Sequence, residues 1–329
     1  MSAVADAGGK GADSHQREGA GKRALITGLA GFTGYYMARE LAAAGYRVFG
    51  TIMPGSALPD LPAGDPGHAP GDIHPVDLLD RAAVCRMVEQ VQPDVVVHLA
   101  GIAFVAHANV DLIYQVNVVG SRNLLEALAA LPQLPTAVLL ASSANIYGNA
   151  DVAIIDEAAA PAPVNDYAVS KLAMEYMARL WMDRLPIILA RPFNYTGVGQ
   201  SENFLLPKIV SHFRRGEREI ELGNLAVARD FSDVRSVVRS YRCLLHFAPG
   251  VRQSNLAFNI CSGQSTSLRS VIAMMEKIAG YQITVKVNQA FVRANDALTL
   301  TGSRAKLDQA IGIVDQVPLA ETLEWMYRS

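Results

Sequence analysis

Three glycines that follow a short apolar run constrain the fold of this chain more than any other feature. The run Arg23 to Thr27 reads RALIT, the glycines are Gly28, Gly31 and Gly34, and a helical pattern covers Thr33 to Ala44. This order predicts a buried strand, a tight turn and a helix. Such a turn lets the backbone approach a pyrophosphate, which the amide groups and the helix dipole would hold. A turn without a ligand is the alternative for the triplet alone, and the strand and helix around it favour the phosphate site.

Further segments repeat the buried-strand signal, with helix-length segments between them. They are Tyr46 to Thr51, Asp94 to Gly101, Thr136 to Ser143 and Pro186 to Arg191. Alternating strands and helices predict a parallel sheet. The expected fold class is therefore α/β, a Rossmann-type doubly wound parallel sheet with a smaller, interleaved C-terminal α/β substrate lobe.

The alternation loosens after Arg191, where the helical patterns of Phe204 to Arg215 and Leu268 to Ala279 mix with isolated strands. FSDV (231–234) and LAFNI (256–260) look like returns to the large sheet, so the two lobes should interleave. The expected division is a disordered tail (1–21), a dinucleotide-binding domain (22–190 plus 231–262) and a substrate lobe (191–230 plus 263–329). The Pro/Gly-rich stretch PGSALPDLPAGDPGHAPG is predicted to be a loop.

Composition excludes several function classes. The formal net charge is −2 and the lysines and arginines are scattered, so we expect no nucleic-acid partner. The three cysteines are odd in number and far apart, which fits neither a disulfide framework nor a zinc site and points to a reducing cytoplasm without a bound metal. The first twenty residues lack an apolar signal segment, and no later stretch is long and apolar enough for a membrane anchor.

The remaining cofactor contacts are expected at the strand ends. An acid about twenty residues beyond the glycines would bind the ribose of NAD, and an arginine would accommodate the phosphate of NADP. TIMPGS follows Gly50 instead, so both cofactors stay open. Asp77 is a plausible adenine contact, and a solvated loop aspartate is an equal alternative. The expected cofactor-binding residues are Gly28, Gly31, Phe32, Thr33, Gly34, Asp77, Leu78, Leu99, Ala100, Gly101, Asn117, Tyr167 and Lys171.

Tyr167 and Lys171 are four residues apart on a predicted helix, so their side chains share one face. An ammonium beside a phenol should lower the pKa of the phenol and make it a competent proton donor and acceptor. Ser142 and Ser143 close the preceding strand, and a serine there could polarise a carbonyl oxygen; the spacing alone does not choose between them. Together these residues indicate hydride transfer between a nicotinamide and a carbonyl.

Asn117 lies in a predicted helix among apolar neighbours, where an amide needs hydrogen bonds. It could brace the helix that carries Tyr167, and a satisfied core asparagine is the alternative.

Six segments, in this order, resemble one family. They read TGLAGFTG, LASSANIYG, DYAVSKLAMEY, ARPFNYTGVGQ, GNLAVARDFSDV and FNICSGQ. The chain thereby resembles the extended short-chain dehydrogenases/reductases, and most closely the GDP-4-keto-6-deoxy-D-mannose reductases, from about Lys22 to Leu307. The resemblance implies NAD(P)H-dependent reduction of a 4-keto group on a GDP-linked 6-deoxyhexose, giving GDP-D-rhamnose or a relative for polysaccharide synthesis. Ser143, Tyr167 and Lys171 would carry the catalysis.

The resemblance also implies substrate contacts. Asn194 and Arg229 match positions on the sugar diphosphate, and RAND resembles a nucleotide contact through Arg293 and Asp296. The planar guanidinium of Arg229 suits paired diphosphate oxygens, although an exposed arginine is often merely solvated. Arg191 and Lys208 are weaker candidates.

The chain departs from its relatives at a few positions. Ala144 and Asn145 stand where sugar 4,6-dehydratases carry an acidic pair, which disfavours dehydration and leaves a 4-epimerase with tightly bound NAD⁺ as the alternative. Tyr195 replaces the histidine that is usual in the reductase motif, so the sugar stays open. A binding protein that has lost its chemistry is a further alternative.

Two predicted helices, Ile113 to Leu131 and Asp166 to Leu185, are apolar around most of their circumference and need cover on two sides. Relatives pair these helices between subunits, which predicts a homodimer. Packing within one subunit is the alternative.

Overall fold

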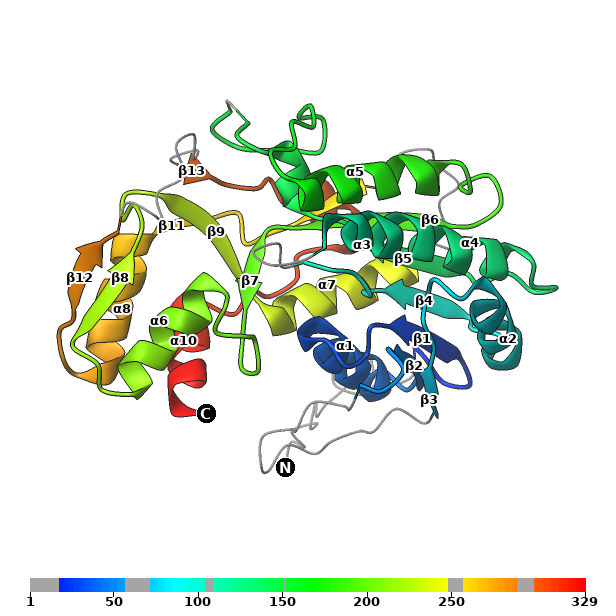
Figure 1. Ribbon diagram of the computed structural model, residues 1–329, viewed down its shortest axis with the longest axis horizontal. Helices are drawn as coiled ribbons and strands as arrows, with labels where there is room; N and C mark the ends of the chain where they lie inside the picture. Colours follow the sequence, from blue (N-terminus) through cyan, green and yellow to red (C-terminus); the bar gives the residue numbers. More distant parts are fainter. Residues whose placement is uncertain (1–17, 57–71, 104–108, 151, 248–256, 289–298) are drawn as a thin grey trace, which may run out of the picture.

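A seven-stranded parallel sheet forms the centre of the structure (Figure 1). The computed structural model describes residues 18–56, 72–103, 109–150, 152–247, 257–288 and 299–329. From one edge to the other the strands are β3 (Asp72–Pro75), β2 (Arg47–Ile52), β1 (Arg23–Thr27), β4 (Val95–His98), β5 (Ala137–Ala141), β6 (Ile187–Pro192) and β10 (Ala257–Ile260). The strand order reverses between β1 and β4, and open α/β sheets bind ligands at the carboxyl edge of such a reversal. The expected Rossmann-type fold is confirmed.

Helices cover both faces of the sheet, because its strands are apolar on both sides. One face carries α1 (Phe32–Ala43), α7 (Val234–Phe247) and α9 (Ala305–Ile311). The other carries α2 (Arg81–Val91), α4 (Ser121–Ala129) and α5 (Asp166–Arg179). Ala24 and Ile26 of β1 pack into the first layer and Leu25 into the second, since successive side chains of a strand point to opposite faces.

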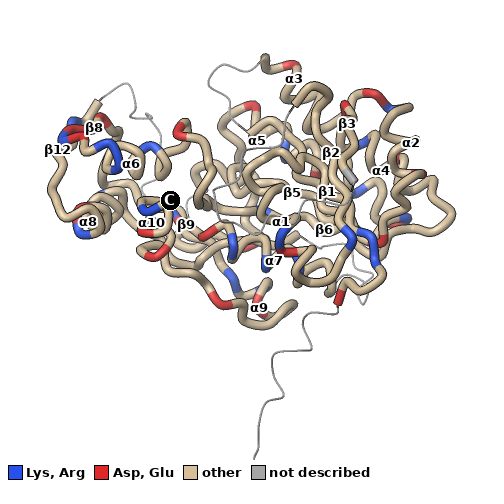
Figure 2. The backbone as a smooth tube through the Cα atoms, turned by 90° about the horizontal axis from the view of Figure 1, so that it is seen from below, with Lys and Arg blue, Asp and Glu red and all other residues tan. Residues whose placement is uncertain are grey.

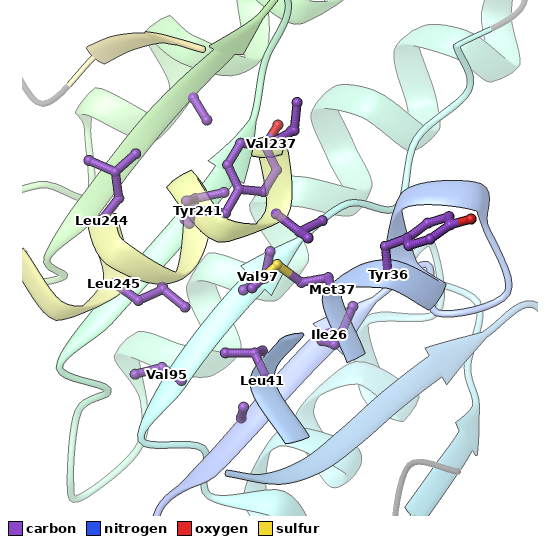
Figure 3. Packing of buried hydrophobic residues seen from close by; sticks show 14 of the residues in the cluster. Ile26, Tyr36, Met37, Leu41, Val95, Val97, Val237, Tyr241, Leu244 and Leu245 are labelled. Carbon is purple, nitrogen blue, oxygen red and sulfur yellow. The ribbon is translucent and has the colours of Figure 1, made fainter. Parts of the chain in front are cut away.

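Figure 3 shows the first of these layers from close by. Met37 and Leu41 of α1 and Tyr241 of α7 pack in one cluster with Val95 and Val97 of β4, and all five are buried. Full burial of one such aliphatic side chain stabilises the fold by about 1.5–3 kcal/mol. This layer therefore fixes α1, and with it the glycine turn, against the ends of the central strands.

The helix that the sequence predicts over 113–131 is interrupted in the structure. It consists of α3 (Val110–Tyr114), a π-helical turn labelled η2 (Gln115–Gly120) and α4, which together run alongside α5. Turns of this kind occur frequently at functional sites. Asn117, which we expect to need hydrogen bonds among its apolar neighbours, lies inside this turn.

A smaller lobe lies beside the sheet, at the left of Figure 1. Its strand β9 (Ala228–Asp233) pairs with β7 (Asn194–Thr196), β11 (Ser265–Ser267) and β13 (Thr299–Leu300), and β8 (Glu219–Leu222) pairs with β12 (Thr284–Val287). Its helices are α6 (Leu205–Arg214), α8 (Leu268–Ala279) and α10 (Leu319–Arg328). These three helices share a hydrophobic core with β8.

The structure corrects three details of the expected division. Residues 231–233 of FSDV end β9 and pair with β7 in the small lobe, and Val234 begins α7. Residues 257–260 of LAFNI form β10 at the edge of the large sheet. Leu307 of α9 is buried in the core of the large sheet, so the stretch after 263 does not belong to the small lobe alone. Residues 18–21 are not part of a disordered tail, because Gly19 bonds the carbonyl of Ala44 and Glu18 forms an ion pair with Arg242. Most of the Pro/Gly-rich loop lies outside the described residues.

Charged residues of both signs are interspersed along the backbone in the view of Figure 2. Within the part of the chain that the structure describes, no helix has both the length and the apolar character needed to cross a bilayer.

Candidate active site

The glycine turn forms a close-fitting cradle at the carboxyl end of β1. Gly28 has φ +75°, and a Cβ there would lie 2.8 Å from the Cα of Ala100. A Cβ on Gly34 would lie 2.3 Å from the carbonyl oxygen of Gly28. Gly31 is the N-cap of α1 and has no side chain to bond the first-turn amides. The residues present therefore fit a pyrophosphate, which would bind the amides at this end of the helix.

The loop after β4 brings further cofactor candidates to the same edge. A Cβ on Gly101 would lie 2.9 Å from Oδ1 of Asn117 and 3.2 Å from Nζ of Lys171, so the three residues meet. Across the sheet, Asp77 follows β3 and accepts a 2.9 Å hydrogen bond from the amide of Leu79, which shapes the turn around the buried Leu78.

The catalytic candidates come from β5 and α5. Asn165 caps α5 by accepting a hydrogen bond from the amide of Ala168 at 2.9 Å, and Tyr167 lies in the first turn. The Tyr167 hydroxyl is hydrogen-bonded to Ser143, which follows β5. Oγ of Ser142 is buried and has no hydrogen-bond partner among the described residues. The geometry thus pairs the phenol with Ser143, the choice that the spacing left open.

The pKa values of Tyr167 and Lys171 differ from the expectation. Burial raises the pKa of Tyr167 to about 12, against the opposing hydrogen bond from Ser143. Burial lowers the pKa of Lys171 to about 8, with Glu175 acting in the other direction. The prediction that Lys171 lowers the pKa of the phenol is wrong for this structure, because Nζ bonds the carbonyl of Ala141 at 2.8 Å and desolvation dominates. At neutral pH the phenol of Tyr167 is therefore protonated and could donate a proton.

The side-chain amide of Asn117 has its hydrogen bonds satisfied and also braces the catalytic helix. Its Oδ1 accepts from the amide of Ile102 at 2.9 Å, and its Nδ2 donates to Oγ of Ser170 at 2.9 Å. Ser170 in turn donates to the carbonyl of Tyr167 at 2.8 Å. The amide therefore ties the loop after β4 to the helix that carries the catalytic candidates.

A buried ion pair one turn beyond Lys171 was missed by the sequence reasoning. Arg191 donates from Nε and Nη2 to the two oxygens of Glu175 at 2.9 and 2.6 Å, and from Nη1 to the hydroxyl of Tyr147 at 2.8 Å. Arg191 is only 4% exposed and bonds interior groups, which contradicts the expectation that it is a substrate contact. No local sequence signal links Arg191 to Glu175, because they lie 16 residues apart on β6 and α5.

Two of the substrate candidates lie on the small sheet. Asn194 of β7 is exposed, and its Nδ2 reaches the carbonyl of Asp230 at 3.4 Å. Arg229 of the neighbouring strand β9 donates to the carbonyl of Ala228 at 2.9 Å. Lys208 on α6 donates to the carbonyl of Glu221 at 3.2 Å. Arg293 and Asp296 lie outside the described residues.

Comparisons with known proteins agree with this arrangement. The model of a family described as GDP-mannose 4,6 dehydratase matches residues 25–326. The chain is 33% identical over 292 residues to a GDP-6-deoxy-D-talose 4-dehydrogenase from Aggregatibacter actinomycetemcomitans, covering 88% of this chain and 90% of the relative. It is 32% identical over 317 residues to a GDP-6-deoxy-D-mannose reductase from Pseudomonas aeruginosa, covering 92% and 95%.

Solved structures give the same picture. A candidate epimerase from Burkholderia cenocepacia is 53% identical with a TM-score of 0.87, covering 94% of this chain and 98% of that one. The structure of RMD from Pseudomonas aeruginosa with NADPH is 29% identical with a TM-score of 0.76, covering 93% and 98%. MoeE5 with UDP-glucose and NAD is 26% identical with a TM-score of 0.77, covering 93% and 97%.

Proposed function

The chain belongs to the GDP-mannose 4,6 dehydratase family of extended short-chain dehydrogenases/reductases, and we propose that it is the 4-ketoreductase of a nucleotide-activated 4-keto-6-deoxysugar. The family is NAD(P)-dependent, and related structures hold NADPH or NAD. The observation that carries the proposal is the position of the Tyr167 hydroxyl, hydrogen-bonded to Ser143 one turn from Lys171, at the carboxyl edge of the sheet.

The proposed chemistry needs one proton and one hydride. The reduced nicotinamide, when bound, supplies the hydride to C4 of the sugar. Tyr167 donates its proton to the oxygen at C4, and Ser143 donates a hydrogen bond to the same oxygen. Gly28, Gly31 and Gly34 would hold the pyrophosphate, and Lys171 the nicotinamide ribose. With the hydride of the bound cofactor and the proton of Tyr167, the C4 ketone would become an alcohol.

The substrate class rests on the relatives. The two similar proteins named above are a GDP-6-deoxy-D-talose 4-dehydrogenase and a GDP-6-deoxy-D-mannose reductase, which share a GDP-linked 6-deoxyhexose. We therefore place a GDP-linked 4-keto-6-deoxyhexose first, with GDP-D-rhamnose or its C4 epimer as product and polysaccharide precursor supply as the role. Asn194 and Arg229 on the small sheet would bind the sugar diphosphate.

Dehydration, the activity named in the family description, is disfavoured by the residues after Ser143. Ala144 has no titratable group, and the amide of Asn145 cannot exchange a proton as a carboxylic acid does. The backbone amide of Asn145 donates to Oγ of Ser143 at 3.1 Å, so the segment shapes the serine instead.

A 4-epimerase is the second candidate, favoured by 53% sequence identity to the solved structure of a candidate epimerase. An epimerase would keep bound NAD⁺ and catalyse no net oxidation. Oxidised cofactor that stays with the purified protein, together with interconversion of C4 epimers, would favour it.

The decisive experiment incubates the purified protein with GDP-4-keto-6-deoxymannose and NADPH or NADH and follows oxidation of the cofactor. We expect turnover, and Tyr167→Phe should lower it by about 10²–10⁴-fold because the general acid is lost. Tyr281→Phe is the control, since this tyrosine lies in the small lobe and its hydroxyl bonds the carbonyl of Phe213. No turnover with GDP- or dTDP-linked 4-keto sugars, or full activity of Tyr167→Phe, would overturn the proposal.

We also propose a homodimer formed by the layer of α3, η2 and α5. Exposed apolar side chains recur there at helical spacing. They are Leu112, Val119, Val169, Tyr176 and Leu180, each at least 38% exposed. A second copy of this face would bury them in a bundle of helices.

A further inference from the structure

A chain of buried hydrogen bonds connects the ends of β1 and β4 to the π-helical turn. Oγ1 of Thr27 lies 2.6 Å from Nδ1 of His98, and Nε2 of His98 lies 2.8 Å from Oγ of Ser121. Ser121 donates to the carbonyl oxygen of Asn117 at 2.7 Å. All four residues are buried. None of the four takes part in the proposed chemistry, and Asn117 alone connects to the helix that carries Tyr167.

The direction of each bond follows from the donors available. A carbonyl oxygen cannot donate, so the single hydroxyl proton of Ser121 must go to Asn117. Ser121 therefore accepts from His98, which requires the proton on Nε2. Burial, with the charge of Lys171 acting in the same direction, lowers the pKa of His98 to about 3, so the ring is neutral and Nδ1 accepts from the hydroxyl of Thr27. One tautomer satisfies the whole chain.

The far end of this chain is the catalytic helix. Asn117 holds the amide and the carbonyl of Ile102, and through Ser170 it reaches the backbone of Tyr167. Its Oδ1 also lies where a side chain on Gly101 would clash. A shift of the π-helical turn would therefore move the loop after β4 and loosen the first turn of α5 together.

We propose that His98 is a positioning residue, which uses its Nε2–H bond to Ser121 to hold the π-helical turn and thereby sets Asn117 between the cofactor loop and the Tyr167 helix. The turnover readout below rests on the proposed function. The cofactor-binding and amide-exchange readouts do not.

The bond itself, and not the volume of the ring, should matter. His98→Leu keeps a side chain of similar volume but removes both ring nitrogens. His98→Gln keeps an amide donor that can reach Ser121. Ser121→Ala removes the acceptor and the bond to Asn117 at little steric cost. Ser240→Ala is the matched control, because Ser240 is a buried helical serine that donates to the carbonyl four residues before it at 2.9 Å, on α7.

The test measures NADPH affinity by calorimetry, amide exchange of residues 115–121, and kcat and KM with the sugar. Ser121→Ala and His98→Leu should each weaken NADPH binding by about 3–10-fold, the effect of one lost hydrogen bond, and speed exchange in the turn. kcat should fall by a similar factor or more, with a smaller change in the KM of the sugar. His98→Gln should recover most of the affinity, and the double variant His98→Leu/Ser121→Ala should be no worse than the poorer single variant.

The inference is overturned if Ser121→Ala matches Ser240→Ala in affinity and exchange, if Gln and Leu at position 98 behave alike, or if the double variant is additive. Should His98→Leu fail to fold, the comparison of His98→Gln with Ser121→Ala decides. A wild type that reduces no sugar, while Ser121→Ala still alters NADPH binding and exchange, would remove the proposed function and leave this inference standing.

Discussion

The hydroxyl of Tyr195 lies 2.7 Å from the hydroxyl of Thr33, so strand β7 of the small lobe is bonded to the first turn of α1. The Tyr195 ring also stacks on Phe32, with centroids 6.1 Å apart and planes at 17°. Nearby, the hydroxyl of Tyr36 donates to the carbonyl of Val198 at 2.7 Å. The tyrosine that replaces the expected histidine therefore joins the cofactor helix to the strand that carries Asn194.

Tyr195→Phe tests this link, because it keeps the stacked ring and removes the hydroxyl. NADPH affinity should fall by about 3–10-fold, in line with one hydrogen bond lost beside the glycine turn. Tyr281→Phe, which loses a hydroxyl bond to the carbonyl of Phe213 within the small lobe, should leave affinity unchanged. Equal effects of the two substitutions in calorimetry would argue against the link.

The two serines after β5 offer a matched pair. Ser143→Ala should lower kcat by about 10²-fold, the usual effect of removing one donor to a developing oxyanion. Ser142→Ala should leave kcat near the wild-type value and not destabilise the fold, because its buried hydroxyl has no described partner to lose. Steady-state kinetics and thermal unfolding of both variants check the assignment, and the reverse ranking would move the role to Ser142.

Activity should depend on pH through Lys171. The pKa of Lys171 is about 8, so its ammonium loses the proton as pH rises through that value. The value of kcat/KM, which reports on the free enzyme, should therefore fall above pH 8. Tyr167 keeps its proton to about pH 12, so its titration does not alter the pH profile in this range. A kcat/KM profile that stays flat from pH 7 to 10 would contradict this prediction.

The same lysine has a stability signature. Its pKa is lower in the folded state than the ordinary 10.5, so the folded chain binds fewer protons between pH 8 and 10.5 and stability rises with pH across that window. The burial of the ammonium costs about 3 kcal/mol below pH 8. Lys171→Met should therefore be more stable than wild type at pH 7, with a gap that narrows towards pH 10 in urea unfolding.

The pair of Arg191 and Glu175 should behave as a unit. Arg191→Met leaves a carboxylate buried without its partner and should cost about 3–5 kcal/mol of unfolding free energy. The double variant Arg191→Met/Glu175→Leu should recover much of that loss. Urea unfolding measures both, and a double variant that loses the sum of the two single losses would show that the residues do not act together.

The dimer predicts a selective effect at Leu180, which is 80% exposed at the end of α5. Leu180→Asp should give a monomer by light scattering at micromolar concentration, because the charge would be buried in the interface. Ile313→Asp is the control, since Ile313 is 87% exposed outside this layer. A monomeric wild type would remove the dimer.

Local sequence signals predicted the strands well, because runs such as that of β4 are apolar on both faces and allow few alternatives. They misplaced FSDV, since a strand of the same composition can pair in either sheet and only the partner strands decide. Tyr167 and Lys171 could be placed on their helix from spacing and order, whereas the choice of Ser143 over Ser142 needed the hydrogen bond to Tyr167. The His98 chain could not be predicted, because a histidine that ends an apolar strand carries no local signal for the serine 23 residues later that it bonds.

The protein chain passes back and forth between the large sheet and the small lobe. It leaves the large sheet after β6 and returns through α7, β10 and α9. Neither the part built on the large sheet nor the small lobe is one continuous stretch of sequence. A single crossover between two genes would therefore not transfer the small lobe intact. A replacement on β7 or β9 would instead act on both strands, because the two are paired.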